Sequence, residues 1–248
     1  MKRPANFYAL LCALILCAAF APGTEPAAQS PAPASQASAQ PAPAGGDQFV
    51  YADFENAQDK KPLSSRGGLV QLTSYQESTP SHFKGLENSS PPMPEVVRLK
   101  PDDPNHAIAF DYELYSPNQY AGVGVEVQGL PYKDGKPSAD DLSAYKFLSM
   151  QVYAKGVPDV SNLRVEIMSR GQGISLTGGF PQMTFKIKPG FNTYKIPLNS
   201  LQQPSWAQTK VGVKDVLKKL TAVSLTAFCE QCTPTHGTVV VDNIVFMK

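Results

Sequence analysis

The sequence has few charged residues and no surplus of either sign. Charged residues make up 17% of the 248 positions, against roughly 25% in an ordinary soluble domain. The 22 Lys and Arg residues balance 21 Asp and Glu residues, for a formal net charge of +1. A protein that binds nucleic acid through its phosphates needs a cationic surplus or patch. The charge balance therefore argues against a nucleic-acid-binding protein.

Catalytic motifs are also scarce. The three histidines, His82, His106 and His236, have no metalloprotease spacing, and the chain has neither a nucleophile elbow nor a phosphate-binding loop. Asp111 and Glu113 lie about 7 Å apart on one face of a predicted strand, a separation that a pair of glycosidase carboxylates also uses. Such pairs on exposed strand faces are usually only solvated. We therefore predict that the protein is not an enzyme.

The longest hydrophobic run is too short to span a membrane. Lys2 and Arg3 precede an uncharged stretch of 15 residues, Phe7 to Ala21, whereas a transmembrane helix needs at least about 17 residues. This pattern predicts a signal peptide over 1–21 and export to the periplasm, the cell surface or the medium. An uncleaved membrane anchor is the alternative.

Two ways of processing this signal stay open. Ala19 and Ala21 have the small-x-small spacing of a signal peptidase site, but Pro22 follows directly. The segment that ends at Cys17 resembles a lipoprotein signal, except that Leu16 replaces the expected small residue. Apart from an uncleaved anchor, a lipid on Cys17 would be the only membrane contact that the sequence suggests.

Residues 22–46 are rich in Ala and Pro and contain no aromatic or large aliphatic residue. Such a segment cannot bury a core, so it is predicted to be a disordered, solvated linker. The remaining residues, 47–248, are long enough to bury a large core without disulfide support.

This third part reads as a series of strands. Apolar and polar residues alternate with a period of two, and turn residues separate the alternating segments. The predicted strands are 48–55, 68–75, 95–100, 107–114, 120–128, 145–154, 161–169, 182–188, 192–198, 220–228 and 237–246. Only 213–220 has a helical pattern. Strands do not alternate with helices, so the sequence predicts an all-β fold, a two-sheet jelly-roll β-sandwich with one short helix.

Five short segments in order carry a family resemblance. They begin at Asp53, Tyr120, Asp141, Phe191 and Val241 and read DFE, YAGVGV, DLSAY, FNTYKIPL and VDNI. Together they resemble galactose-binding-like β-sandwich domains over residues 48–247, in particular family 11 carbohydrate-binding modules and the complex I intermediate-associated protein 30 domain. The first resemblance implies a glycan partner. The second implies a protein-interaction or assembly domain, which is the alternative function.

Alternation also places one set of polar and aromatic residues on the outer faces of strands. Aromatic rings can stack on the apolar face of a sugar, and amide, guanidinium and carboxylate groups match its hydroxyls. The predicted glycan platform consists of Tyr120, Glu126, Gln151, Tyr153 and Arg164, with Glu166 beside it and room left at Gly122 and Gly124. The alternative is an ordinary exposed face, or one covered by residues 60–94. We expect Trp206, which follows Pro204-Ser205, to pack over the edge of the core. A contact at the rim of the binding site is the alternative.

Two cysteines, Cys229 and Cys232, lie between the last two predicted strands. In an exported protein this spacing favours a local disulfide. A zinc half-site that includes His236 is the alternative, although it has no obvious fourth ligand.

The family resemblance further implies a structural calcium ion where the first and last strands meet. Glu55 and Asp242 are the two residues of this chain that match. Alternation in 237–246 puts Asp242 on one face with Val240, Ile244 and Phe246, where an ionised carboxylate needs a partner. Ca²⁺ with backbone carbonyls would supply one. Alternatively, backbone N–H groups or a Lys or Arg side chain would be the partner of the Asp242 carboxylate.

Overall fold

The computed structural model describes residues 46–55, 61–75, 93–100, 102, 104–115, 119–127, 139–156, 162–171, 179–228 and 235–248. The chain divides into the units Met1–Ser38 and Ala39–Lys248, and the described residues belong to the second. The predicted signal peptide (1–21), nearly all of the linker (22–46) and the pair Cys229 and Cys232 lie outside the described residues. In the described part, no helix has the length and hydrophobicity to cross a membrane.

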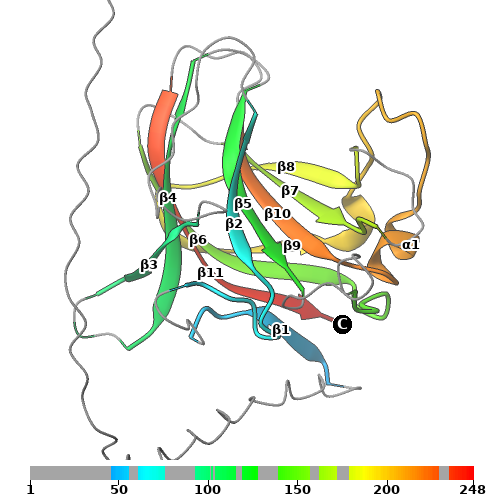
Figure 1. Cartoon of the computed structure of the whole chain (residues 1–248), viewed down its shortest axis with the longest axis horizontal. Coiled ribbons are helices and arrows are strands. Elements are labelled where there is room, and N and C mark those ends of the chain that lie inside the picture. Colours follow the sequence, from blue (N-terminus) through cyan, green and yellow to red (C-terminus); the bar gives the residue numbers. More distant parts are fainter. Residues whose placement is uncertain are drawn as a thin grey trace, which may run out of the picture. The chain divides into compact units, whose positions relative to one another are not determined.

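The described residues form two antiparallel sheets (Figure 1). The six-stranded sheet contains β1 (Gln48–Ala52), β3 (Glu95–Arg98), β4 (His106–Leu114), β6 (Phe147–Gly156), β9 (Gly190–Pro197) and β11 (Thr235–Met247). The five-stranded sheet contains β2 (Val70–Tyr75), β5 (Tyr120–Glu126), β7 (Asn162–Met168), β8 (Gln182–Lys186) and β10 (Ala222–Phe228). Each of the predicted strands is present, and the all-β sandwich is confirmed.

The chain changes sheet at almost every connection after β4. β4, β6, β9 and β11 belong to the six-stranded sheet, in the order β3-β4-β11-β6-β9, with β1 paired to β11. β5, β7 and β10 belong to the other sheet, in the order β2-β5-β10-β7-β8. Strands that follow one another in sequence therefore lie on opposite sides of the core, as in a jelly roll.

The core lies between the two sheets and takes one face of each strand. In β6, Leu148, Met150 and Val152 are buried, whereas Phe147 and Gln151 on the other face are partly exposed. Burying each such apolar side chain stabilises the fold by about 1.5–3 kcal/mol. The alternation read from the sequence thus assigned the two faces of β6 correctly.

Tyr51 of β1 connects the two sheets through the core. Its ring is buried and contacts Phe246 of β11 edge-on, with 5.5 Å between the ring centroids. Its hydroxyl donates a hydrogen bond to the backbone oxygen of Val125 in β5, at 2.7 Å. Because the hydroxyl has a partner, the ring is buried without an unsatisfied polar group.

The described residues also contain two short helices. The 3₁₀-helix η1 (Leu198–Ser200) follows β9, and α1 (Val213–Leu217) precedes β10. Val216 and Leu217 are the buried residues of α1. The helix predicted over 213–220 is confirmed but shorter, because Leu220 forms an isolated β-bridge with Asp140.

Candidate functional site

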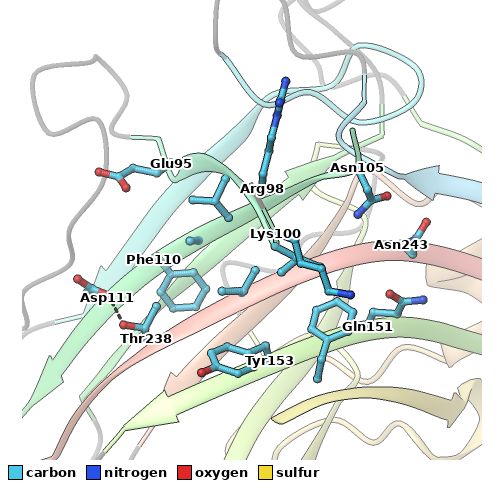
Figure 2. A pocket seen from close by; sticks show the side chains of 15 residues that line it. Glu95, Arg98, Lys100, Asn105, Phe110, Asp111, Gln151, Tyr153, Thr238 and Asn243 are labelled. Carbon is cyan, nitrogen blue, oxygen red and sulfur yellow. Dashed lines mark hydrogen bonds between the residues drawn. The ribbon is translucent and has the colours of Figure 1, made fainter. Parts of the chain in front are cut away.

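A groove of about 1110 Å³ crosses the outer face of the six-stranded sheet, the face turned away from the core. Residues of β3, β4, β6, β9 and β11 line it, together with the segment between β3 and β4. Figure 2 shows these side chains gathered over the strands.

Cross-strand pairing aligns five lining residues in one row. Glu95, Ala109, Val240, Tyr153 and Phe191 are successive Cα partners from β3 to β9. Ala109 and Val240 have small side chains, so the middle of the row forms the floor of the groove. The larger aromatic rings of Tyr153 and Phe191 lie at one end of the row. Phe191 is 40% exposed. Directly opposite residues on neighbouring strands have their Cβ atoms about 5 Å apart, so the row presents two adjacent aromatic side chains to the groove.

Polar groups accompany the rings. Gln151 precedes Tyr153 by two residues on the same face of β6 and lines the groove. Figure 2 shows the amine end of Lys100 reaching toward Gln151, whereas the Arg98 guanidinium points away from it. The groove therefore offers an amide and one cation on the same side.

Asp111 of β4 and Thr238 of β11 lie at the other end of the groove (Figure 2). They are Cα partners, and the Thr238 hydroxyl donates a hydrogen bond to Asp111 Oδ1. Glu113, the second acid of the pair considered for catalysis, accepts a hydrogen bond from the Tyr115 hydroxyl and does not line the groove. Each acid thus has its own hydroxyl partner.

A β-bulge in β11 shapes the groove beside Gln151. Asp242 is opposite Gln151 and Val245 is opposite Ser149, so β11 has one residue more than β6 in this interval. The extra residue is accommodated at Asn243, whose φ is 49°, in the left-handed region that Asn tolerates better than most residues.

Because of this bulge, the prediction that Asp242 shares a face with Ile244 and Phe246 is wrong. Val241 and Ile244 both point into the core, so the period of two is broken between them. Asp242 is therefore on the outer face with Val240, and does not share a face with Ile244 and Phe246. It is nevertheless fully buried.

The Asp242 carboxylate accepts three hydrogen bonds. The side-chain amides of Asn105 and Asn243 both donate to Oδ2 at 2.9 Å, and the backbone N–H of Asn243 donates to Oδ1 at 2.7 Å. Burial raises the pKa of Asp242 above its ordinary value; the hydrogen bonds lower it, and the negative charges of Glu55 and Asp53 raise it further. Because Asn105 and Asn243 line the groove, Asp242 fixes the position of two groove amides.

Glu55, the other predicted calcium ligand, is close enough for its negative charge to raise the pKa of Asp242. Its carboxylate accepts a hydrogen bond from the backbone N–H of His106 at 2.7 Å and lies 3.0 Å from His106 Nδ1. Among the described residues, no three His, Cys, Asp or Glu side chains form a group that could hold a metal ion. The two carboxylates bring suitable charge, but their ligand number is too small without backbone oxygens. The calcium ion stays a prediction.

The structure divides the predicted platform between the two sheets. Gln151 and Tyr153 lie in β6 and line the groove, whereas Tyr120, Glu126 and Arg164 lie in β5 and β7 of the other sheet. The outer faces of a two-sheet sandwich point in opposite directions. The prediction of a single platform is therefore wrong, and the groove contains two of its five residues.

The three residues of the other sheet have partners within the protein. The Arg164 guanidinium carbon lies 5.2 Å from the ring centroids of both Tyr120 and Phe228, which gives two cation–π contacts. Glu126 accepts a hydrogen bond from the Gln71 side chain at 3.1 Å. These contacts hold β2, β5, β7 and β10 together.

Sequence reasoning missed several groove residues. Phe191, Asn105 and Asn243 were assigned no role in binding, although Phe191 and Asn243 belong to the family-like segments. Extending the alternation of 192–198 back by one residue would have placed Phe191 with Thr193 and Lys195 on an outer face. No local signal marks Asn105, because its role depends on a residue far along the chain.

No model of a protein family matches the chain, and no curated protein matches it in sequence. Several solved structures, however, match the chain when folds are compared. A family 11 carbohydrate-binding module from Clostridium thermocellum, in complex with a β-1,3-1,4-mixed-linked tetrasaccharide, has 16% identity and a TM-score of 0.49 over 81% of this chain and 95% of that one. The family 30 module of the C. thermocellum cellulosomal cellulase Cel9D-Cel44B has 9% identity and a TM-score of 0.46 over 73% and 92%.

An exo-β-agarase is also similar, with 16% identity and a TM-score of 0.41 over 80% of this chain and 25% of that chain. The two-sheet β-sandwich that the resemblance implied is present in the described residues, and the chain is similar to these family 11 modules at 16% identity. The resemblance to the complex I domain stays a prediction.

Proposed function

We propose that the protein is a non-catalytic carbohydrate-binding protein that holds a glycan chain in the groove of the six-stranded sheet. The observation that carries this proposal is the cross-strand pair Tyr153 and Phe191 on the groove surface. Neighbouring aromatic side chains on a sheet offer flat apolar surfaces to the C–H faces of sugar rings. The amides of Gln151, Asn105 and Asn243 line the same groove and can hydrogen-bond hydroxyl groups.

The size of the groove favours an oligosaccharide. Sites for small molecules usually enclose about 300–1,000 Å³, and this groove of about 1110 Å³ extends across five strands. A single sugar would leave most of this surface uncovered. We therefore infer that several consecutive sugar units occupy it.

The charges of the groove favour a neutral glycan. Lys100 is the cation that reaches over the groove, and the acids Glu95 and Asp111 also line it, so the lining has no cationic surplus. A polyanionic glycan would bring a charge that this lining does not complement. A mixed-linked β-1,3-1,4-glucan tetrasaccharide is uncharged and is bound by the family 11 module, which makes it the first probe to use.

The test is calorimetric titration of the purified protein with hexasaccharides of cellulose, xylan, laminarin and agarose and with the mixed-linked tetrasaccharide. We expect at least one to bind. Replacing one stacking ring, in Tyr153→Ala or Phe191→Ala, should cost about 1 kcal/mol or more, a loss of affinity of at least about fivefold. Tyr115→Ala is the matched control, since Tyr115 is 38% exposed, close to the 40% of Phe191, and lies outside the groove.

Three results would contradict parts of the proposal. Unchanged affinity in both Tyr153→Ala and Phe191→Ala would move the site away from the groove. Binding of no glycan at all would favour the alternative, a protein-interaction or assembly domain. Release of new reducing ends from a bound glycan would contradict the non-catalytic part.

We also propose that the protein is exported. The support is the charged start and the 15-residue hydrophobic run, Phe7 to Ala21, followed by the Ala- and Pro-rich segment. The mature protein should begin between Cys17 and Gln29. Intact mass of the exported protein checks this: a chain that keeps Met1 contradicts export with cleavage, and a lipidated Cys17 identifies the lipoprotein form.

A further inference from the structure

Trp206 is the only tryptophan of the chain, and 67% of it is exposed. It lies in a turn that the Ala207 N–H closes by donating to the Pro204 carbonyl at 3.0 Å. The prediction that Trp206 packs over the edge of the core is therefore wrong. Tryptophan is usually well buried in folded proteins, so such exposure requires a structural reason.

The loop that carries Trp206 is held by Gln203. The Gln203 amide nitrogen donates to the backbone oxygens of Gly179 and Thr209, at 2.9 and 3.0 Å, and its oxygen accepts from the N–H of Val211 at 2.8 Å. Ala207, next to Trp206, is buried. The Gln203 side chain thus joins its own loop to Gly179 and to residues 209–211, and the turn is fixed on both sides of the exposed ring.

The indole ring of Trp206 also packs against the backbone of another segment. A Cβ at Gly179 would lie 3.0 Å from Trp206 Cζ3 and 3.1 Å from Cη2, and Gly179 has a φ of +74°. The short distances and the positive φ both favour glycine at this position. The six-membered ring of the indole therefore rests against the Gly179 backbone, while most of the side chain faces solvent.

The exposed residues close to Trp206 in the chain are polar. The exposed neighbours in the same loop are Gln202, Ser205, Gln208, Thr209 and Lys210. A loop that exposes a flat aromatic surface together with amide and hydroxyl groups suits the mixed apolar and polar faces of a sugar ring. An apolar protein partner would leave these polar groups without hydrogen bonds when it covered them.

This loop is remote from the groove. Gln202 pairs with Gln182 of β8, at the edge of the five-stranded sheet. In Figure 1 the segment between η1 and α1 projects at the right of the view, whereas β3 and β4 lie at the left. A short oligosaccharide in the groove therefore cannot also contact Trp206.

We infer that Trp206 is a second glycan-binding site, in which the indole stacks on one sugar ring of a polysaccharide. The ligand class rests on the proposed function, but the site itself does not depend on the groove. A single stacked ring binds weakly on its own. On a polymer that occupies both sites, however, the second contact becomes intramolecular and raises the overall affinity.

Because Trp206 is the only tryptophan, its fluorescence reports on this site alone. The full chain is titrated with the five oligosaccharides named above and with their parent polysaccharides. We expect the emission to change with at least one of them, and to change in the same way in the groove variant Tyr153→Ala. Affinity for the parent polysaccharide should fall several-fold in Trp206→Ala and be partly restored in Trp206→Phe, whereas affinity of the groove for the short oligosaccharide is unchanged.

The outcomes separate this inference from the proposed function. Constant emission with every glycan, or full polysaccharide affinity in Trp206→Ala, contradicts the second site. An emission change that disappears in Tyr153→Ala also contradicts it, because Trp206 would then only sense the groove. An emission change that persists while the groove variants bind normally supports the second site and contradicts the groove.

Discussion

The side-chain amide of Asn105 donates a hydrogen bond to the carboxylate of Asp242, 137 residues further along the chain, with 2.9 Å between Nδ2 and Oδ2. The same carboxylate holds Asn243 at the bulge of β11. Asn105 precedes β4, so one buried acid joins the β3–β4 segment to the last strand. Both amides line the groove, and the position of its polar wall therefore depends on Asp242.

We predict that Asp242→Ala destabilises the fold markedly. The substitution removes the acceptor of two side-chain amides and one backbone N–H, and an unsatisfied buried donor costs about 1–3 kcal/mol. The free energy of unfolding should fall by about 2 kcal/mol or more, and by less in Asp242→Asn, which keeps one acceptor oxygen. Urea denaturation measures both. Asp47→Ala, which removes an exposed acid, should stay within about 0.5 kcal/mol of the parent protein.

The proposed calcium ion makes a different prediction at the same residues. A cation bound to Glu55 and Asp242 in the native state alone must raise the melting temperature. The protein should therefore melt at a higher temperature in saturating Ca²⁺ than in excess chelator, and Asp242→Ala should lose this difference. Identical melting in both solutions would show that the hydrogen bonds of Asp242 are sufficient by themselves.

A side chain at Gly122 of β5 is predicted to destabilise the fold. A Cβ there would lie 2.2 Å from the Leu225 backbone oxygen and 2.6 Å from Thr226 Cα, both in β10. The glycine thus permits close approach of two central strands, and does not leave room for a ligand as the sequence suggested. Gly122→Ala should force the strands apart and cost about 1–3 kcal/mol, the usual range for overpacking.

The measurement is again the free energy of unfolding in urea. Ala121→Gly is a useful comparison, because it loosens the neighbouring core position without forcing the backbones apart. Its expected cost is about 1 kcal/mol, mostly from the greater freedom of glycine in a strand. A Gly122→Ala protein as stable as the parent would show that β5 and β10 can separate freely.

The strands could be predicted from the sequence because their signals are local. Alternation and turn residues are properties of ten consecutive residues, and they locate β6 and β10 without any knowledge of their neighbours. The family-like segments then indicated the β-sandwich. Nothing in this reading depended on which strands pair.

The candidate site depends on pairing, and this explains the errors. Alternation shows that Tyr153 and Arg164 point outward, but it does not show that β6 and β7 belong to different sheets. The bulge at Asn243 adds one residue and moves Asp242 to the other face, which no period of two can reveal. The contact between Asn105 and Asp242 connects segments whose proximity only the fold creates.

Glu166 and Asp141 are two carboxyls whose pKa values the fold moves in opposite directions. Burial raises the pKa of Glu166 above its ordinary 4.5, although Arg164 and Arg170 oppose the change. Hydrogen bonds from the hydroxyl and the backbone N–H of Ser143 lower the pKa of Asp141 below its ordinary 3.8. The two residues should therefore contribute to stability in opposite ways as the pH changes.

The folded protein holds the proton of Glu166 more tightly than the unfolded chain does. Its contribution is thus most favourable below the unfolded pKa and is lost as the pH rises through the folded pKa. For Asp141 the contribution is present above the unfolded pKa and is lost as the pH falls through the folded pKa. Glu166→Gln and Asp141→Asn remove these two titrations one at a time.

Urea denaturation from about pH 3 to about pH 7 tests both signs together. The free energy of unfolding of the parent protein minus that of Glu166→Gln should decrease as the pH rises from about 4 to about 7. The same difference for Asp141→Asn should instead decrease as the pH falls from about 5 to about 3, the range in which Asp141 loses its charge-assisted bonds to Ser143. A difference for Glu166→Gln that grows toward neutral pH would mean that the positive charges of Arg164 and Arg170 outweigh burial at this carboxyl.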